Sequence, residues 1–208
     1  MNIKEFEKLP ILGILRGIEE SMVEPLVQCV INSGLKTIEI TMNTEEAGLL
    51  IRKMVSLSHN QLTIGAGTVL TIHQLQEAMD AGATFIVSPI INEDLVNFCA
   101  VNNIPVFPGA LTPNEIYKAW NLGASMVKVF PAKTFGPAYF KEIKAPLNSI
   151  KLMATGGVSV DNVREFVKNG ADAISFGASI FKQNWMRNNE YHLIENEIKK
   201  LIQNYLDS

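Results

Sequence analysis

The sequence has few cysteines, no run of basic residues and no long apolar stretch, and each absence excludes a class of function. Its two cysteines, Cys29 and Cys99, lie in apolar helical patterns without metal-ligand spacing, and we interpret them as reduced, buried side chains of a cytoplasmic protein. The net charge is −3, and no run of Lys or Arg occurs, which argues against nucleic acid or an anionic membrane as a partner. Residues 1–9 are polar and no apolar run approaches the length of a membrane span, so we expect neither a signal peptide nor a transmembrane segment.

Short apolar strands alternate with amphipathic helices along the whole chain. Of its 208 residues 47% are hydrophobic and 19% charged, without a shift in composition, so we expect one domain spanning residues 1–208. The predicted strands cover residues 11–15, 37–41, 62–66, 84–87, 105–107, 125–130, 150–154 and 172–176, and the predicted helices cover 3–8, 19–32, 44–57, 71–80, 92–102, 112–121, 136–144, 159–169 and 190–205. Continuous rather than alternating hydrophobicity in these strands is typical of a parallel sheet covered on both faces.

Eight strand–helix units favour an α/β fold, namely a (β/α)8 TIM barrel with a short N-terminal helix. The structural alternative is an open doubly wound sheet, which normally carries a glycine-rich nucleotide loop after its first strand. Here that strand is followed by Arg16-Gly17-Ile18-Glu19. We therefore predict the barrel, in which the active site lies at the C-terminal ends of the strands.

One predicted strand contains a lysine within an apolar run, in Ser125-Met126-Val127-Lys128-Val129-Phe130-Pro131-Ala132. Burial disfavours an ammonium group and lowers its pKa, which yields a neutral amine that can form a Schiff base with a carbonyl substrate. The alternative is that Lys128 extends its charged end out of the strand or pairs with a structural carboxylate.

The other ionisable residues are sorted by their place along the strands. Lys36 and Lys151 stand at strand starts, on the wrong face for chemistry, and we expect Lys133, just after the lysine strand, to be solvated. Glu39 lies inside the second strand. Because buried ion pairs rarely stabilise a fold, we interpret Lys128 and Glu39 as nucleophile and proton shuttle, with a structural ion pair as the alternative.

Two further residues at strand ends are candidates for contact with a substrate. Arg16 ends the first strand, and its guanidinium suits a carboxylate; a surface arginine that caps a helix end is the alternative. Thr68 follows Gly65-Ala66-Gly67 and either offers its hydroxyl to the substrate or caps the next helix.

Small residues follow the last two strands, in Ala154-Thr155-Gly156-Gly157-Val158 and Ser175-Phe176-Gly177-Ala178-Ser179. Backbone N–H groups at such positions bind anions, and the loops after strands seven and eight hold a phosphate in many barrels. A tight turn alone could also require these glycines. The sequence thus indicates a small substrate with a phosphate at one end, an anionic group at the other and a carbonyl near Lys128.

These motifs resemble, in order and spacing, the family of 2-keto-3-deoxy-6-phosphogluconate (KDPG) aldolases, which includes 4-hydroxy-2-oxoglutarate and phosphogalactonate (KDPGal) aldolases. The resemblance extends from Ile11 to Lys182. Its blocks are Ile14-Leu15-Arg16-Gly17, Ile38-Glu39-Ile40-Thr41, Gly65-Ala66-Gly67-Thr68-Val69, Val87-Ser88-Pro89, Phe107-Pro108-Gly109, Val127-Lys128-Val129-Phe130-Pro131 and Thr155-Gly156-Gly157-Val158.

The resemblance implies a class I aldolase that cleaves KDPG to pyruvate and glyceraldehyde 3-phosphate. Lys128 would form the Schiff base, and Glu39 would act as the acid and base. Thr68, Pro89 and Phe130 would line the pyruvate end, and Thr155, Gly156, Gly157, Gly177, Ala178 and Ser179 the phosphate end. Members of the family are usually homotrimeric barrels that need neither a metal nor another cofactor, so we expect the same here.

One position departs from the family pattern. Well-known members carry an arginine two residues after the threonine of the glutamate strand, where it contacts the pyruvyl carboxylate, and here that position is Asn43. Our hypothesis is that Arg16 makes this contact instead. The Arg16/Asn43 pair resembles the KDPGal branch, whereas Thr155 resembles the KDPG branch, so the sequence leaves the configuration at C4 open.

Two other functions remain as alternatives. A metal-dependent decarboxylase or a sugar-phosphate epimerase would also use a phosphate-binding barrel, but it would need acidic metal ligands at the strand ends, and no strand ends in a pair of acidic residues. A non-catalytic barrel that binds a sugar phosphate is the second alternative, although it has no reason to bury Lys128 beside Glu39.

Overall fold

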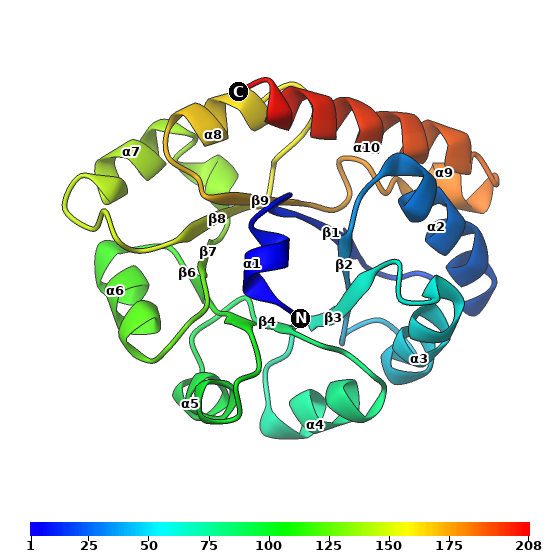
Figure 1. Ribbon diagram of the computed structural model, residues 1–208, viewed down its shortest axis with the longest axis horizontal. Helices are drawn as coiled ribbons and strands as arrows, with labels where there is room; N and C mark the ends of the chain where they lie inside the picture. The colour runs from blue at the N-terminus through cyan, green and yellow to red at the C-terminus, as the bar shows by residue number, and fades with distance from the viewer.

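Parallel strands form a ring that is surrounded by helices (Figure 1). The computed structural model describes all residues from 1 to 208. The strands are β1 (Ile11–Leu15), β2 (Thr37–Thr41), β3 (Thr63–Gly67), β4 (Ile86–Val87), β5 (Val106–Phe107), β6 (Gly109–Ala110), β7 (Val127–Val129), β8 (Leu152–Thr155) and β9 (Ala173–Phe176). The helices are α1 (Ile3–Phe6), α2 (Glu20–Ser33), α3 (Ala47–Ser58), α4 (Ile72–Asp80), α5 (Glu93–Val101), α6 (Pro113–Asn121), the 3-10 helix η1 (Ala132–Thr134), α7 (Ala138–Lys144), α8 (Val163–Lys168), α9 (Gln183–Arg187) and α10 (Tyr191–Leu206).

The ring has the order β5-β4-β3-β2-β1-β9-β8-β7-β6, and its two ends are consecutive in the chain. They are separated only by Pro108, which has no N–H to donate to a neighbouring strand. Its carbonyl still accepts a hydrogen bond from the Lys128 N–H at 2.9 Å. The predicted (β/α)8 barrel with a short N-terminal helix is therefore confirmed. The fifth strand was predicted over residues 105–107. In the structure it continues to Ala110 and is split into β5 and β6 by the proline.

Other differences from the predicted elements have local causes. Helix α3 begins at Ala47 rather than at residue 44, because the Thr44 hydroxyl is hydrogen-bonded to Thr41 and to the Gly17 N–H. The helix predicted over 159–169 is shortened to α8, since the Asn162 side chain bonds the Ser159 N–H and the Gly157 carbonyl and holds this segment as a loop. Helix α9 was not predicted.

The N-terminal end of the barrel is filled by large apolar side chains. Phe6 of α1 lies 5.8 Å from Phe107 between ring centroids, and Phe85 lies 5.9 Å from Phe107. In Figure 1 helix α1 stands at the centre of the ring. A Cβ on Gly65 would lie 2.4 Å from the Phe85 ring, so glycine makes room for this packing. The apolar filling leaves the C-terminal end of the barrel for polar groups.

Both cysteines are buried free thiols, as predicted for Cys29 and Cys99. None of the helices is both long and apolar enough to cross a membrane.

Candidate active site

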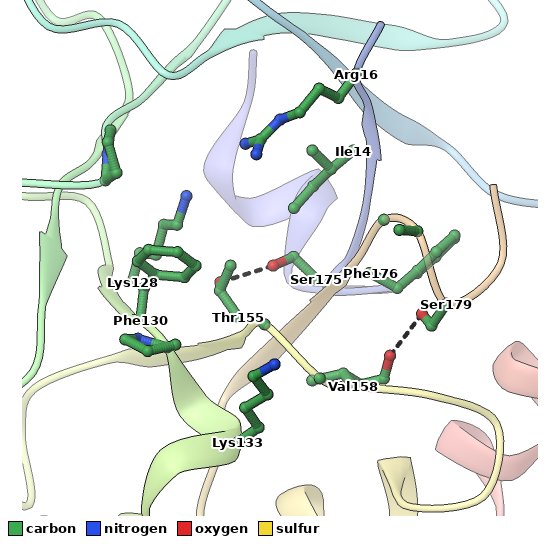
Figure 2. A pocket seen from close by; sticks show the side chains of 16 residues that line it. Ile14, Arg16, Lys128, Phe130, Lys133, Thr155, Val158, Ser175, Phe176 and Ser179 are labelled. Atoms are coloured by element: carbon green, nitrogen blue, oxygen red, sulfur yellow. Dashed lines mark hydrogen bonds between the residues drawn. The ribbon is translucent and has the colours of Figure 1, made fainter. Parts of the chain in front are cut away.

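A cavity of about 650 Å³ opens at the C-terminal ends of the strands (Figure 2). Ten of the residues proposed from the sequence line it: Arg16, Pro89, Lys128, Phe130, Thr155, Gly156, Gly157, Gly177, Ala178 and Ser179. Its charged lining consists of Arg16, Lys128 and Lys133, and no Asp or Glu is among the lining residues. A cavity with this charge suits an anionic ligand.

Lys128 occupies the centre of β7, and the residue is only 4% exposed. Its Nζ lies 5.2 Å from the centroid of the Phe130 ring. Burial lowers the pKa of the Lys128 amine, the charge of Glu39 opposes this shift, and the charge of Arg16 adds to it. The lowered pKa favours the neutral amine that a nucleophile requires.

Glu39 occupies the centre of β2 and is 1% exposed. Burial raises the pKa of this carboxyl to about 7, although the charges of Lys128 and Arg16 act in the opposite direction. A carboxyl that titrates near neutral pH can both donate and accept a proton.

The Glu39 carboxyl occupies the space next to Gly67 of β3, where any other residue would place its side chain. A Cβ on Gly67 would come within 2.1 Å of Oε1 of Glu39, so only glycine leaves space for this side chain. The Oε2 atom has no hydrogen-bond partner, and Glu39 forms no ion pair with Lys128 within 4.0 Å. The structure therefore disfavours the structural ion pair and leaves Oε2 of Glu39 as a buried acceptor without a partner, although Glu39 is not among the residues that line the cavity.

Arg16 follows β1, and two hydrogen bonds fix the backbone at this residue and the next. The Gln183 side chain of α9 donates to the Arg16 carbonyl at 3.0 Å, and the adjacent Gly17 N–H donates to the Thr44 hydroxyl at 3.0 Å. The guanidinium extends toward the cavity in Figure 2 and donates to the Thr68 hydroxyl at 3.4 Å. Arg16 thus lines the cavity and does not cap a helix.

Three of the residues proposed from the sequence, Glu39, Thr68 and Asn43, lie outside the set of cavity-lining residues. Thr68 has a positive φ of 54° and contacts Arg16, whereas the N-cap of α4 is Thr71, so the capping alternative for Thr68 is wrong. Asn43 is exposed in the turn after β2 and makes no hydrogen bond through its side chain. The structure brings Arg16, and not Asn43, to the cavity.

The loops after β8 and β9 present unbonded backbone donors at the opposite end of the cavity. The N–H groups of Gly156, Gly157, Val158, Gly177, Ala178 and Ser179 donate no hydrogen bond within the chain. The side chains differ: Thr155 and Ser175 share a hydrogen bond of 2.6 Å, and the Ser179 hydroxyl donates to the Val158 carbonyl at 2.7 Å. The backbone, rather than these hydroxyls, is available for an anion.

Sequence reasoning missed some of the lining residues. Ser175 points inward from β9, and its place in a strand next to an anion loop was the signal for it. Lys133 is exposed, as expected, yet it also lines the cavity. No group of three or more His, Cys, Asp or Glu side chains is placed to hold a metal ion.

A parallel barrel with a buried lysine of lowered pKa and a buried carboxyl at its C-terminal end is the architecture of a Schiff-base enzyme. The family model described as KDPG and KHG aldolase matches residues 3–197. The chain therefore belongs to the KDPG and KHG aldolase family.

Relatives in other organisms agree with this assignment. The chain is 33% identical to 2-dehydro-3-deoxy-6-phosphogalactonate aldolase of Escherichia coli (strain K12), over 84% of this chain and 86% of the relative. It is 34% identical to 2-dehydro-3-deoxy-phosphogluconate aldolase of Treponema pallidum (strain Nichols), over 78% and 79% respectively.

Solved structures are similar along nearly the full length. The structure described as native KDPGal has a TM-score of 0.89 at 29% identity and covers 96% of both chains. KDPG aldolase from Legionella pneumophila, solved with pyruvate captured as a covalent carbinolamine intermediate, has a TM-score of 0.86 at 25% identity, covering 94% of this chain and 95% of that one.

Proposed function

We propose that this chain is a class I aldolase that cleaves KDPG to pyruvate and glyceraldehyde 3-phosphate, and that it also accepts 4-hydroxy-2-oxoglutarate. The observation that carries the proposal is that one barrel buries a lysine, whose pKa is lowered, and a carboxyl, whose pKa is raised to about 7, close enough for their charges to act on each other. Opposite shifts of this kind support Lys128 as the nucleophile and Glu39 as the acid and base.

The reaction begins at Lys128. Its neutral amine attacks the C2 ketone to form a carbinolamine, and Glu39 supplies the proton with which the C2 hydroxyl leaves as water. The resulting protonated imine withdraws electrons from C3. Because Arg16 lies near this lysine and is positively charged, it also opposes protonation of the free amine.

Cleavage then requires a base. The Glu39 carboxylate removes the proton of the C4 hydroxyl, the C3–C4 bond breaks, and its electron pair passes into the imine to give an enamine. The aldehyde leaves, and Glu39 returns the proton to C3. Water then hydrolyses the protonated imine to pyruvate and the free Lys128 amine, and Glu39 takes up the proton that is released.

The two ends of the cavity support the choice of substrate. At one end Arg16 offers a guanidinium for the C1 carboxylate. At the other end the unbonded N–H groups of Gly156, Gly157, Gly177 and Ala178 suit a phosphate. Lys128 projects between them in Figure 2.

A second candidate is cleavage of KDPGal, the C4 epimer. It is favoured by Arg16 together with Asn43, and by the 33% identity to two relatives named as phosphogalactonate aldolases, one of them designated probable. Thr155 beside the cavity favours KDPG. The test is the rate of pyruvate release from each epimer at matched concentrations. We expect a higher kcat/KM for KDPG; a preference for KDPGal would replace the first candidate by the second, and release from neither would refute both.

A non-catalytic sugar-phosphate-binding barrel is disfavoured because binding alone does not require the buried Glu39 and Lys128.

We also propose a homotrimer in the cytoplasm. Seven of the ten exposed large apolar side chains lie between residues 70 and 135 without counting Phe130, which lines the cavity, and this supports an interface in that part of the chain. Light scattering should give three times the mass of one chain, and a monomer would contradict the trimer; cell fractionation tests the location.

A further inference from the structure

We propose that Lys133 binds the phosphate group of the substrate and thereby sets the preference for phosphorylated over unphosphorylated substrates; this inference rests on the proposed aldolase function. Lys133 lies in η1, directly after the strand that carries Lys128. Its side chain extends along the wall of the cavity beside Val158 in Figure 2.

Lys133 is fixed to the loop that presents the unbonded backbone donors. Its own N–H donates to the Gly156 carbonyl at 3.0 Å. A Cβ on Gly157 would lie 2.5 Å from Cβ and 3.2 Å from Cδ of Lys133, so the lysine stem passes directly over this glycine. In Figure 2 the ammonium group points toward the part of the cavity that Thr155 and Val158 line.

Other side-chain donors at this end are already engaged. Thr155 is hydrogen-bonded to Ser175, and the Ser179 hydroxyl donates to Val158. Lys133, in contrast, takes part in no ion pair within 4.0 Å, although Lys144 and Lys151 both pair with Asp172. Lys133 is therefore the cation at this end that has no partner within the chain.

The charges of the cavity and of the substrate also correspond. A phosphate monoester carries a charge of about −1.5 to −2 at neutral pH and offers strong acceptor oxygens. Arg16 is assigned to the carboxylate and Lys128 to the carbonyl, which leaves Lys133 to complement the phosphate. A lysine supplies a point charge for this purpose and tolerates different orientations of the phosphate.

The test compares condensation of pyruvate with glyceraldehyde 3-phosphate and with glyceraldehyde in wild type, Lys133→Met and Lys133→Arg. Lys141→Met is the matched control, because Lys141 is exposed on α7 and does not line the cavity. We expect Lys133→Met to lower kcat/KM for the phosphorylated aldehyde by about tenfold to a hundredfold, the range for a hydrogen bond to a charged group. The unphosphorylated aldehyde should react at the wild-type rate, and Lys133→Arg should restore most of the loss.

Three outcomes separate this inference from the proposed function. If wild type condenses neither aldehyde with pyruvate, the aldolase function itself fails. If wild type is active but Lys133→Met behaves as Lys141→Met does, or loses activity equally with both aldehydes, the phosphate role of Lys133 is refuted. Covalent trapping of pyruvate without any aldehyde should be unchanged in Lys133→Met, and loss of trapping would contradict a role confined to the phosphate.

Discussion

Glu39 places a carboxyl group inside the barrel without a hydrogen-bond partner for Oε2. Its pKa is raised by burial from 4.5 to about 7 in the folded state. Between these two values the unfolded chain loses its proton at Glu39 while the folded chain keeps it. The stability that this group contributes is therefore complete below pH 4.5 and is lost as the pH rises through 7.

Replacing Glu39 by Gln tests this linkage. The free energy of unfolding of wild type relative to Glu39→Gln should fall by about 3 kcal/mol between pH 4.5 and pH 8, as calculated from the two pKa values. Urea unfolding of both proteins at the two pH values measures the difference. Turnover of Glu39→Gln should be lower by about 10²–10⁴-fold. An unchanged stability difference would show that the pKa of Glu39 is the same in the folded and the unfolded chain, and would contradict the shift caused by burial.

Arg16→Ala tests which residue binds the substrate carboxylate. Loss of the guanidinium should raise the KM for pyruvate in condensation by about tenfold to a hundredfold, because a hydrogen bond to a charged group is worth about 1.5–3 kcal/mol. Steady-state kinetics with varied pyruvate provides the measurement. Arg52→Ala, in α3 and outside the cavity, is the control. Unchanged KM and turnover in Arg16→Ala would refute the hypothesis that this arginine replaces the one missing at Asn43.

Among the elements, β3 makes room for the buried carboxyl of Glu39. Its residue Gly67 has no side chain where the Glu39 carboxyl lies. Gly67→Ala would place a Cβ 2.1 Å from Oε1 of Glu39. We expect a loss of stability of about 1–3 kcal/mol and a large loss of turnover, since the carboxyl must move. In a Glu39→Ala background the same substitution should cost much less stability.

Urea unfolding of the single and double variants provides this measurement. Gly48→Ala in α3 is the control, because its Cβ would meet only the flexible end of Glu77. Equal destabilisation by Gly67→Ala in both backgrounds would show that Glu39 does not occupy this space.

The strand and helix pattern was predictable because continuous apolar runs and helical spacing are local signals. Thr112 is an example: the predicted helix over 112–121 begins there with a capping box between Thr112 and Glu115, whose two residues are only three positions apart in the sequence. The split at Pro108 was not predictable, because it depends on pairing with two other strands. Strand β4 pairs with β5 before the proline, and β7 pairs with β6 after it. Helix α9 is only five residues long, and its role in holding Arg16 through Gln183 depends on contacts between residues distant in the sequence.

The candidate site was predictable to different extents at its two ends. Lys128 and Glu39 stood out because ionisable groups are rare in buried strands. Lys133 had no such signal, because a lysine after a strand is ordinarily solvated. Its position over Gly157 follows from the meeting of η1 with the loop after β8, which the sequence alone does not reveal.

In the whole molecule, the barrel divides stability and chemistry between its two ends. Phe6, Phe85 and Phe107 fill the N-terminal end, and Lys151 there pairs with Glu7 and Asp172. The C-terminal end holds the basic cavity with the buried Lys128. This arrangement confirms the prediction that Lys151 lies at the end of the barrel opposite the cavity. Lys128 is the buried amine that lines the cavity.

The central claim is that Lys128 forms a Schiff base with pyruvate. It is tested most directly by incubating the protein with pyruvate and sodium borohydride and locating the adduct by peptide mass spectrometry, with and without a chelator. We predict one reduced pyruvyl group per chain, on Lys128 and unaffected by the chelator, and none in Lys128→Ala. Absence of an adduct in wild type, or its appearance on Lys133 instead, would contradict this account.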